Sequence, residues 1–297
     1  MKKLAMTAVA AAAVLGAGAA HAYTSGTFSN GFVVPNVIHE ASGATTAVGI
    51  INTTDGNVPV YWTFHDQESN HVTDGCFVLT GKDYEPFVWS QNSGTNLTGK
   101  RGYLVFAAGN TSTATTCTAA TASLADSSAI IAGNAFYVDP VAKDVAFTPV
   151  IDGPLTLTGN LTKLDANSLT EVAGAAPVKA GQKISARYFI DGAAGGNDTS
   201  IVVWSTGNQK ATYTVNMFDD KQNRKSVNFD LQHAELDWFN PEEIGGRPAA
   251  FLDGFIEWEV PALGTATVGA GSVFVYSVIS SPAFGAVQTV LGAHTVK

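Results

Sequence analysis

The chain has 297 residues, a formal net charge of −9 and 45% hydrophobic residues. The hydrophobic fraction excludes intrinsic disorder over most of the chain, and the acidic balance argues against nucleic acid or an anionic membrane as a partner. Charged residues make up only 14%, below the roughly 25% of a typical soluble protein. Thr, Ser, Asn and Gly fill the polar positions instead, as they often do on exported β-rich surfaces.

Residues 1–22 have the pattern of a secretory signal peptide. Lys2 and Lys3 form a charged start, an apolar segment runs from Leu4 to Ala20, and Ala20-His21-Ala22 is a small-x-small cleavage site. An uncleaved membrane anchor is the alternative, but the apolar segment is Ala-rich and ends in a good cleavage site. We expect export by a Sec-type signal to the periplasm, the cell surface or the medium, a mature chain that begins at Tyr23, and no later membrane span.

Short strand patterns fill the first half of the mature chain. Phe28–Ile38 is apolar and β-branched but contains Gly31 and Pro35, and the missing N–H of Pro35 favours an edge strand. Ala47–Ile51 is a continuous apolar run, typical of a strand buried on both faces. Further strands are expected at Val58–Asp66, His71–Leu79, Arg101–Ala108 and through Phe136–Val138, with a helical turn at Pro140–Asp144.

The chain has two cysteines, Cys76 and Cys117. An even pair in an exported protein predicts one disulfide. A metal or redox role is the alternative, but neither cysteine has a CxxC spacing or an adjacent His.

Residues 152–181 are the expected boundary, because they are rich in Gly, Thr, Ala and Pro. Within them, Pro154–Thr158 is either a last strand or an inter-domain hairpin, and Ile184–Ile190 then opens a second unit. Pro282–Gly292 has the apolar spacing of a short amphipathic helix, with a final strand as the alternative. We expect a signal peptide at 1–22, a first domain at 23–160 and a second at 161–297.

Three segments occur twice in the same order. The first set is Thr46–Asn52, Val58–Asp66 and Gly102–Phe106, and the second is Thr199–Ser205, Ala211–Asp220 and Gly254–Trp258. The members of each pair lie 152 to 154 residues apart. An offset this constant through three segments predicts an internal duplication.

Many short strands, frequent turn signals and no long helical period predict an all-β fold of two tandem, related β-sandwiches. In each repeat a Thr-led apolar strand is followed by a strand that ends in Phe-x-Asp. This motif resembles the immunoglobulin-like modules of bacterial surface proteins, over about half of each unit. The resemblance implies an Ig-like architecture and carries no activity.

One pair of carboxylates has a spacing that catalysis can use. Glu257 and Glu259 alternate in Gly254–Val260 and would project from one strand face about 7 Å apart, as in some glycosidases. The alternative is a solvated strand face, and the first repeat has Val105 and Ala107 at the aligned positions. No nucleophile elbow, P-loop or dinucleotide fingerprint occurs, so we do not expect an enzyme.

Acidic residues cluster at one turn of each repeat, Asp66 with Glu68 and Asp219 with Asp220. These side chains either bind Ca²⁺ or cap hairpin turns through backbone N–H groups. The D-x-D-x-D-G pattern is absent and the histidines are not spaced as metal ligands, so the turn role is favoured and no cofactor is expected.

Aromatic residues in turn-rich segments are the strongest candidates for contact with a partner. Phe87 and Trp89 lie in one such segment and Trp238 and Phe239 in its counterpart. They form either a contact surface or a cover over the end of each sandwich.

We therefore expect a non-enzymatic exported structural or interaction protein of the cell surface or extracellular matrix. Its expected partners are copies of itself or other envelope proteins, bound through the aromatic loops or through strand addition by Phe28–Ile38. A carbohydrate-binding module that uses the loop aromatics to bind glycans is the alternative.

Overall fold

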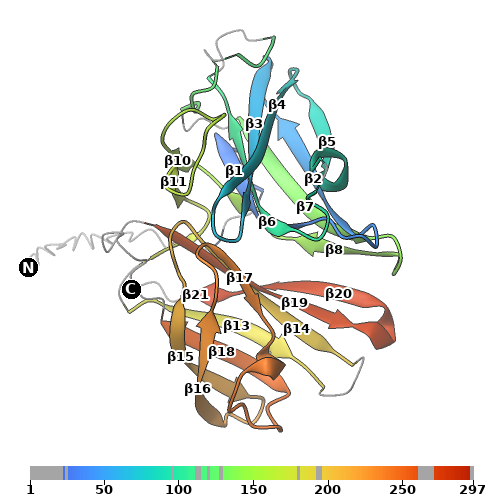
Figure 1. Ribbon diagram of the computed structural model, residues 1–297, viewed down its shortest axis with the longest axis vertical. Coiled ribbons are helices and arrows are strands. Elements are labelled where there is room, and N and C mark those ends of the chain that lie inside the picture. The colour runs from blue at the N-terminus through green and yellow to red at the C-terminus, as the bar shows by residue number, and fades with distance from the viewer. Residues whose placement is uncertain are drawn as a thin grey trace, which may run out of the picture.

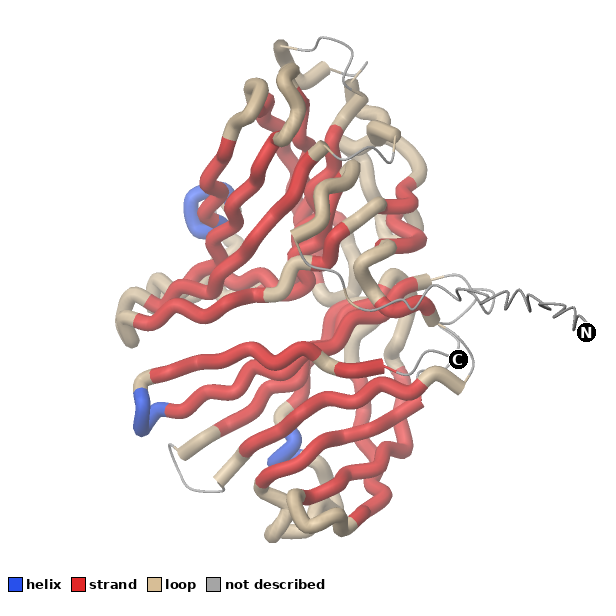
Figure 2. Tube along the Cα trace, turned by 180° about the vertical axis from the view of Figure 1, so that it is seen from behind, coloured by secondary structure: helices blue, strands red, loops and turns tan. Residues whose placement is uncertain are grey.

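The computed structural model describes residues 23, 26–94, 96–110, 115–118, 121–126, 130–178, 181–191, 196–259 and 271–294. The predicted signal peptide lies outside these residues. Figures 1 and 2 show two lobes made almost entirely of strands, stacked along the long axis of the molecule. The all-β prediction is confirmed. None of the described helices is long and apolar enough to cross a bilayer.

The first lobe is a sandwich of two antiparallel sheets. Their strand orders are β4-β3-β6-β1-β9 and β5-β2-β7-β8. The elements are β1 (Gly31–Ile38), β2 (Thr45–Asn52), β3 (Val58–Asp66), β4 (His71–Leu79), β5 (Tyr84–Val88), α1 (Trp89–Asn92), β6 (Arg101–Ala108), β7 (Ile131–Asp139), β8 (Asp144–Thr148) and β9 (Ile151–Asp152). Between the sheets lies a core that contains Phe32, Trp62, Phe64, Trp89 and Phe106.

A small hairpin connects the lobes. It consists of β10 (Leu155–Leu157) and β11 (Leu169–Val172) and is followed by β12 (Ala176–Pro177). Of the two alternatives for Pro154–Thr158, a last strand or a hairpin between the units, the structure has the hairpin. Asn30 of the first lobe accepts a 2.8 Å hydrogen bond from the Leu155 amide. The Val172 amide donates a 2.9 Å bond to Ser272 of the second lobe. The hairpin is therefore tied to both lobes.

The second lobe repeats the topology of the first. Its sheets have the orders β16-β15-β18-β13-β21 and β17-β14-β19-β12, with β20 also paired to β19. Adding twelve to each strand number of the first lobe gives these orders, except that β12 has no counterpart in the first lobe. The elements are β13 (Lys183–Phe189), β14 (Asp198–Ser205), β15 (Ala211–Asp219), β16 (Arg224–Leu231), β17 (Leu236–Phe239), η1 (Pro241–Glu243), β18 (Asp253–Glu259), β19 (Ser272–Ser281), η2 (Pro282–Phe284), β20 (Ala286–Leu291) and β21 (Ala293–His294).

The repeated segments agree in detail as well as in order. Thr46 Oγ1 accepts a hydrogen bond from the Ile38 amide at the end of β1. Thr199 Oγ1 accepts one from the Phe189 amide at the end of β13. In both lobes, therefore, the threonine that begins the repeat lies near the start of a strand in one sheet and bonds the last residue of a strand in the facing sheet of the same lobe.

Two sequence-based expectations were wrong, and in a third segment the alternative was correct. Pro35 does not mark an edge strand, since β1 lies between β6 and β9. Because β9 pairs only with Phe32 and Val33, and β1 changes register against β6 between Val34 and Val37, Pro35 lies where no ladder bond is needed.

The other two concern helices. Residues 140–143 form the turn of the β7–β8 hairpin without a helix. At Pro282–Gly292 the favoured helix was wrong and the alternative of a final strand is confirmed, since β20 follows η2 and adds to β19 over six residue pairs. The apolar residues of this segment do not alternate strictly between the two faces of the strand, and their spacing therefore matched a helical period.

The lobes pack through unlike sheets. Side chains from β1, β3 and β6 of the first lobe meet side chains from β14, β17 and β19 of the second in a third apolar cluster. The second-lobe sheet in this contact corresponds to the other sheet of the first lobe, β5-β2-β7-β8. The molecule is therefore four sheets deep, and the main lobe contact is heterologous. The corresponding edge strands β8 and β20 also meet, where Thr289 Oγ1 donates a hydrogen bond to the Phe147 carbonyl.

Candidate functional site

The predicted disulfide is present. Cys76 on β4 is bonded to Cys117, with a Cα–Cα distance of 6.2 Å. Cys117 belongs to the segment between β6 and β7, so the bond ties this connection to the sheet that faces the second lobe.

Phe87 and Trp89 do not form an exposed platform. Phe87 lies on strand β5 and is 3% exposed, and Trp89 begins α1 and is fully buried. Both rings pack against Trp62 in the first core, with centroid distances of 5.2 and 6.1 Å. They cover the end of the sandwich, which was the alternative reading, and so offer no stacking surface to a sugar or protein in this structure.

Trp238 and Phe239 separate to opposite faces of β17. Strand pairing makes Phe239 the counterpart of Phe87, and both rings turn inward. Trp238 turns toward the first lobe, where the Arg101 guanidinium lies 4.2 Å from its ring centroid. Trp238 is thus part of the contact between the lobes.

Glu257 and Glu259 lie on the outer side of β18, on a sheet face that we call the Glu257 face. It also includes Lys183, Arg224 and Phe255. Lys183 Nζ lies 2.8 Å from Glu257 Oε1. The surroundings of Glu257 are those of a solvated strand face that carries an ion pair.

The acidic turns are capped by their own carboxylates. Asp66 accepts hydrogen bonds from the amides of Glu68 and Asn70, and Asp219 accepts them from Lys221 and Asn223. These oxygens are therefore used within the turn. In the part of the chain that the structure describes, no group of three or more His, Cys, Asp or Glu could hold a metal ion.

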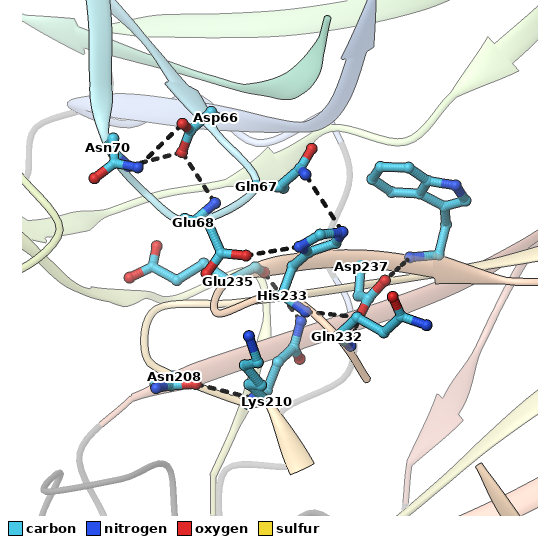
Figure 3. A network of polar contacts seen from close by, with 12 residues as sticks. Asp66, Gln67, Glu68, Asn70, Asn208, Lys210, Gln232, His233, Glu235 and Asp237 are labelled. Carbon is cyan, nitrogen blue, oxygen red and sulfur yellow. Dashed lines mark hydrogen bonds and ion pairs between the residues drawn. The ribbon is translucent and has the colours of Figure 1, made fainter. Parts of the chain in front are cut away.

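The β3–β4 turn docks onto the second lobe through polar contacts (Figure 3). His233 Nδ1 lies 2.6 Å from Glu68 Oε1, and His233 Nε2 lies 3.3 Å from Gln67 Nε2. The Glu235 amide donates to the Gln67 carbonyl at 3.2 Å. The turn that Asp66 shapes therefore holds the lobes together.

Glu235 is the buried centre of this contact. The hydroxyls of Ser69 and Tyr103 each donate a 2.7 Å hydrogen bond to Glu235 Oε2. Burial raises the pKa of Glu235 to about 7, although both hydrogen bonds favour the ionised form. Sequence reasoning missed Glu235, Ser69 and Tyr103, because their roles depend on which faces of the two lobes meet.

His65 lies beside the same cluster. Its ring stacks on Tyr103 with a centroid distance of 5.0 Å and an interplanar angle of 9°. Burial is the main reason that the pKa of His65 falls to about 4. The packing around Tyr103 therefore favours a neutral His65 as well as a neutral Glu235.

The most apolar exposed surface is the outer side of sheet β5-β2-β7-β8, which we call the Phe136 face. Tyr84, Phe136, Val145 and Phe147 on this face are 56%, 40%, 58% and 45% exposed. Strand pairing places Ala47, Ile51, Pro86, Val88, Asn134 and Val138 on the same side. None of these side chains is charged.

The corresponding face of the second lobe is covered by the first lobe. Strand pairing makes Val202 and Trp204 the counterparts of Gly49 and Ile51, and Phe274 and Tyr276 the counterparts of Ala132 and Asn134. These four second-lobe residues are at most 2% exposed. Of the first-lobe counterparts, Gly49 and Ala132 are buried and Ile51 and Asn134 are half-buried, so this surface is open at Tyr84, Phe136, Val145 and Phe147 around them.

Comparisons with known proteins add no relative. No protein-family model matches the chain, and no curated protein matches it.

Proposed function

We propose that this chain is a non-enzymatic exported structural protein that associates with a second copy of itself through the Phe136 face. The observation that carries the proposal is the difference between the lobes: sheet β17-β14-β19 buries its outer side within the chain, whereas the outer side of sheet β5-β2-β7-β8 exposes the uncharged side chains of Tyr84, Phe136, Val145 and Phe147. Apolar patches of this kind commonly mark protein contacts.

The charges on the Glu257 face support a second copy of the chain as the partner of the Phe136 face. The Glu257 face carries Glu257, Glu259, Lys183 and Arg224, and burying it against an apolar sheet would desolvate these charges. Two Phe136 faces can meet without burying a charge. A twofold contact between copies therefore fits the chain better than a repeat of its internal heterologous contact.

Export and duplication complete the proposal. The signal-like residues 1–22 and the Cys76–Cys117 bond favour an oxidising compartment. The matching strand orders and the equivalent bonds of Thr46 and Thr199 support descent of both lobes from one unit. After duplication, one copy of the sheet surface serves the lobe contact and the other remains for a partner.

The test is the mass of the chain from Tyr23 onward by light scattering across a range of concentrations. We expect a dimer or larger species, and we expect Phe136→Asp to return it to a monomer. Phe255→Asp on the Glu257 face is the matched control, since Phe255 is 39% exposed against 40% for Phe136, and it should associate like the wild type. A wild-type monomer at every concentration would overturn the proposal, as would equal association of both variants.

A further inference from the structure

The β7–β8 and β19–β20 hairpins end in equivalent tips. Residues 140–143 form one tip and residues 282–285 the other, and each tip begins with a proline and ends with a residue at positive φ. Strands β8 and β20 meet where Thr289 Oγ1 donates to the Phe147 carbonyl, and each of these residues is the fourth after its tip. Both tips therefore project from the same side of the molecule (Figures 1 and 2).

The second tip carries an exposed phenyl ring that the first tip lacks. Phe284 is 84% exposed, more than any other large apolar side chain that the structure describes, and Ala142 occupies the equivalent position of the first tip. The Gly285 amide donates a 3.1 Å hydrogen bond to the Pro282 carbonyl, which closes the turn around Phe284. A side chain on such a short, hydrogen-bonded turn can bind a partner with little loss of conformational freedom.

A cavity of about 230 Å³ lies between the lobes, close to the second tip. Ser280 and Val287, which pair with each other near the end of the β19–β20 hairpin, belong to its lining. An engineered cavity of roughly 150 Å³ holds a benzene molecule, so the space is sufficient for the ring of a phenylalanine. Apolar residues from both lobes line it, namely Ile38, Ala146, Phe147, Val202, Val278 and Val287.

The polar groups of the cavity do not require a charged occupant. Arg101 is half-buried, and the Glu40 carboxylate in the same lining acts on its charge. The Asn36 side chain is a hydrogen-bond partner of the Tyr276 hydroxyl. Because these groups are matched within the chain, an apolar occupant leaves them with the partners they already have.

We propose that Phe284 of each copy enters the cavity between the lobes of a second copy. Each chain holds this ring close to its own cavity but in solvent, so one twofold contact can fill both cavities at once. Phe147 lies on the Phe136 face and also lines the cavity, which makes the two contacts continuous. The inference rests on the proposed association between copies and adds a second contact to it.

Substitution at the tip tests the insertion without disturbing either core. Phe284→Ser should weaken association of the chain from Tyr23 onward at least tenfold in light scattering, because the burial of a phenyl ring is lost. Phe255→Ser is the matched control, since it removes an exposed phenylalanine from the Glu257 face and should associate like the wild type. Equal association of the two variants would show that Phe284 stays in solvent.

A second variant blocks the cavity. Ser280→Trp places an indole at the cavity lining, so a chain with this change keeps the ring of Phe284 but should not accept one. Mixed with Phe284→Ser, it should form dimers more tightly than either variant alone, because the mixed pair regains one of the two insertions. No gain on mixing would overturn the proposal. If Phe136→Asp dissociates the chain while Phe284→Ser does not, the Phe136 contact remains and the insertion is wrong, whereas a wild-type monomer would end both proposals.

Discussion

Val105 and Glu257 occupy the same position in the two lobes. Val105 on β6 pairs with Val33 and Thr63, and Glu257 on β18 pairs with the corresponding Ser185 and Asn216. Val105 is 1% exposed at the lobe contact, whereas Glu257 lies on an outer face beside Lys183. The residue at this strand position is thus apolar in the lobe whose sheet packs against the other lobe, and charged in the lobe whose sheet faces solvent.

A carboxylate at position 105 should separate the lobes. Val105→Glu would place a charge in the apolar cluster between them without a cation to pair with it, which costs at least about 3 kcal/mol. Urea unfolding should show this loss. The reciprocal change Glu257→Val should shift stability by only about 0.5 kcal/mol, as surface substitutions do. Equal costs for the two changes would contradict the assignment of the faces.

Glu235 should make the protein less stable as the pH rises. Its pKa is about 7 in the folded chain against the ordinary value of 4.5 for a glutamate, so the folded state holds this proton more tightly than the unfolded state. The resulting stability is complete below about pH 4.5 and is lost as the pH rises toward 7. Glu235→Gln keeps an oxygen to accept the bonds from Ser69 and Tyr103 but cannot ionise.

Denaturant unfolding at pH 5 and pH 8 measures this effect. Glu235→Gln should unfold with nearly wild-type free energy at pH 5 and be more stable at pH 8, by up to about 3 kcal/mol. Glu259→Gln on the outer face is a suitable control and should show no such pH-dependent gain. If Glu235→Gln were equally destabilised at both pH values, the carboxyl would be ionised in the folded protein.

His65 should make the protein less stable as the pH falls, the opposite of the effect of Glu235. Its pKa is about 4 in the folded chain against the ordinary value of 6.5 for a histidine, so the stability that the neutral ring contributes is present above pH 6.5 and is lost as the pH falls toward 4. The second lobe has Phe218 at this position, stacked on Phe255 at 4.6 Å and 12°. His65→Phe keeps the stack and removes the titration. Between pH 7 and 4.5 it should lose roughly 2 kcal/mol less stability than the wild type, and an identical loss in both proteins would rule out a buried neutral His65.

The features that could be predicted from the sequence depend on one sheet at a time. Trp62 and Phe64 point to one side of β3 and alternate in the sequence with Tyr61 and Thr63 on the other side, and this period identifies a strand without reference to its neighbours. The all-β class and the Cys76–Cys117 bond follow from such local patterns and from composition, whereas for Pro154–Thr158 the same patterns left a last strand and a hairpin open.

The features that could not be predicted depend on how two sheets pack against each other. Nothing local to Tyr103 or Glu235 shows that a carboxyl of one lobe meets a phenol of the other, because 132 residues separate them. The burial of Trp89 likewise depends on Trp62 and Phe64 of the facing sheet. One sequence signal for the lobe contact was available, the difference between the repeats: Val105 and Ala107 are apolar, whereas Glu257 and Glu259 at the aligned positions are charged.

Removing the disulfide should weaken the first lobe and leave the assembled fold intact. Cys76 and Cys117 are 41 residues apart in the chain, and closing a loop of this length stabilises a protein by about 4 kcal/mol on the chain-entropy estimate. The double variant Cys76→Ala/Cys117→Ala should therefore unfold at lower urea concentration, by 2 to about 4 kcal/mol. Because Cys76 also packs at the edge of the lobe contact, a reduced wild type serves as the control without lost side chains. Should reduction leave the urea midpoint unchanged, the cross-link would contribute nothing and the sheets alone would hold the segment between β6 and β7.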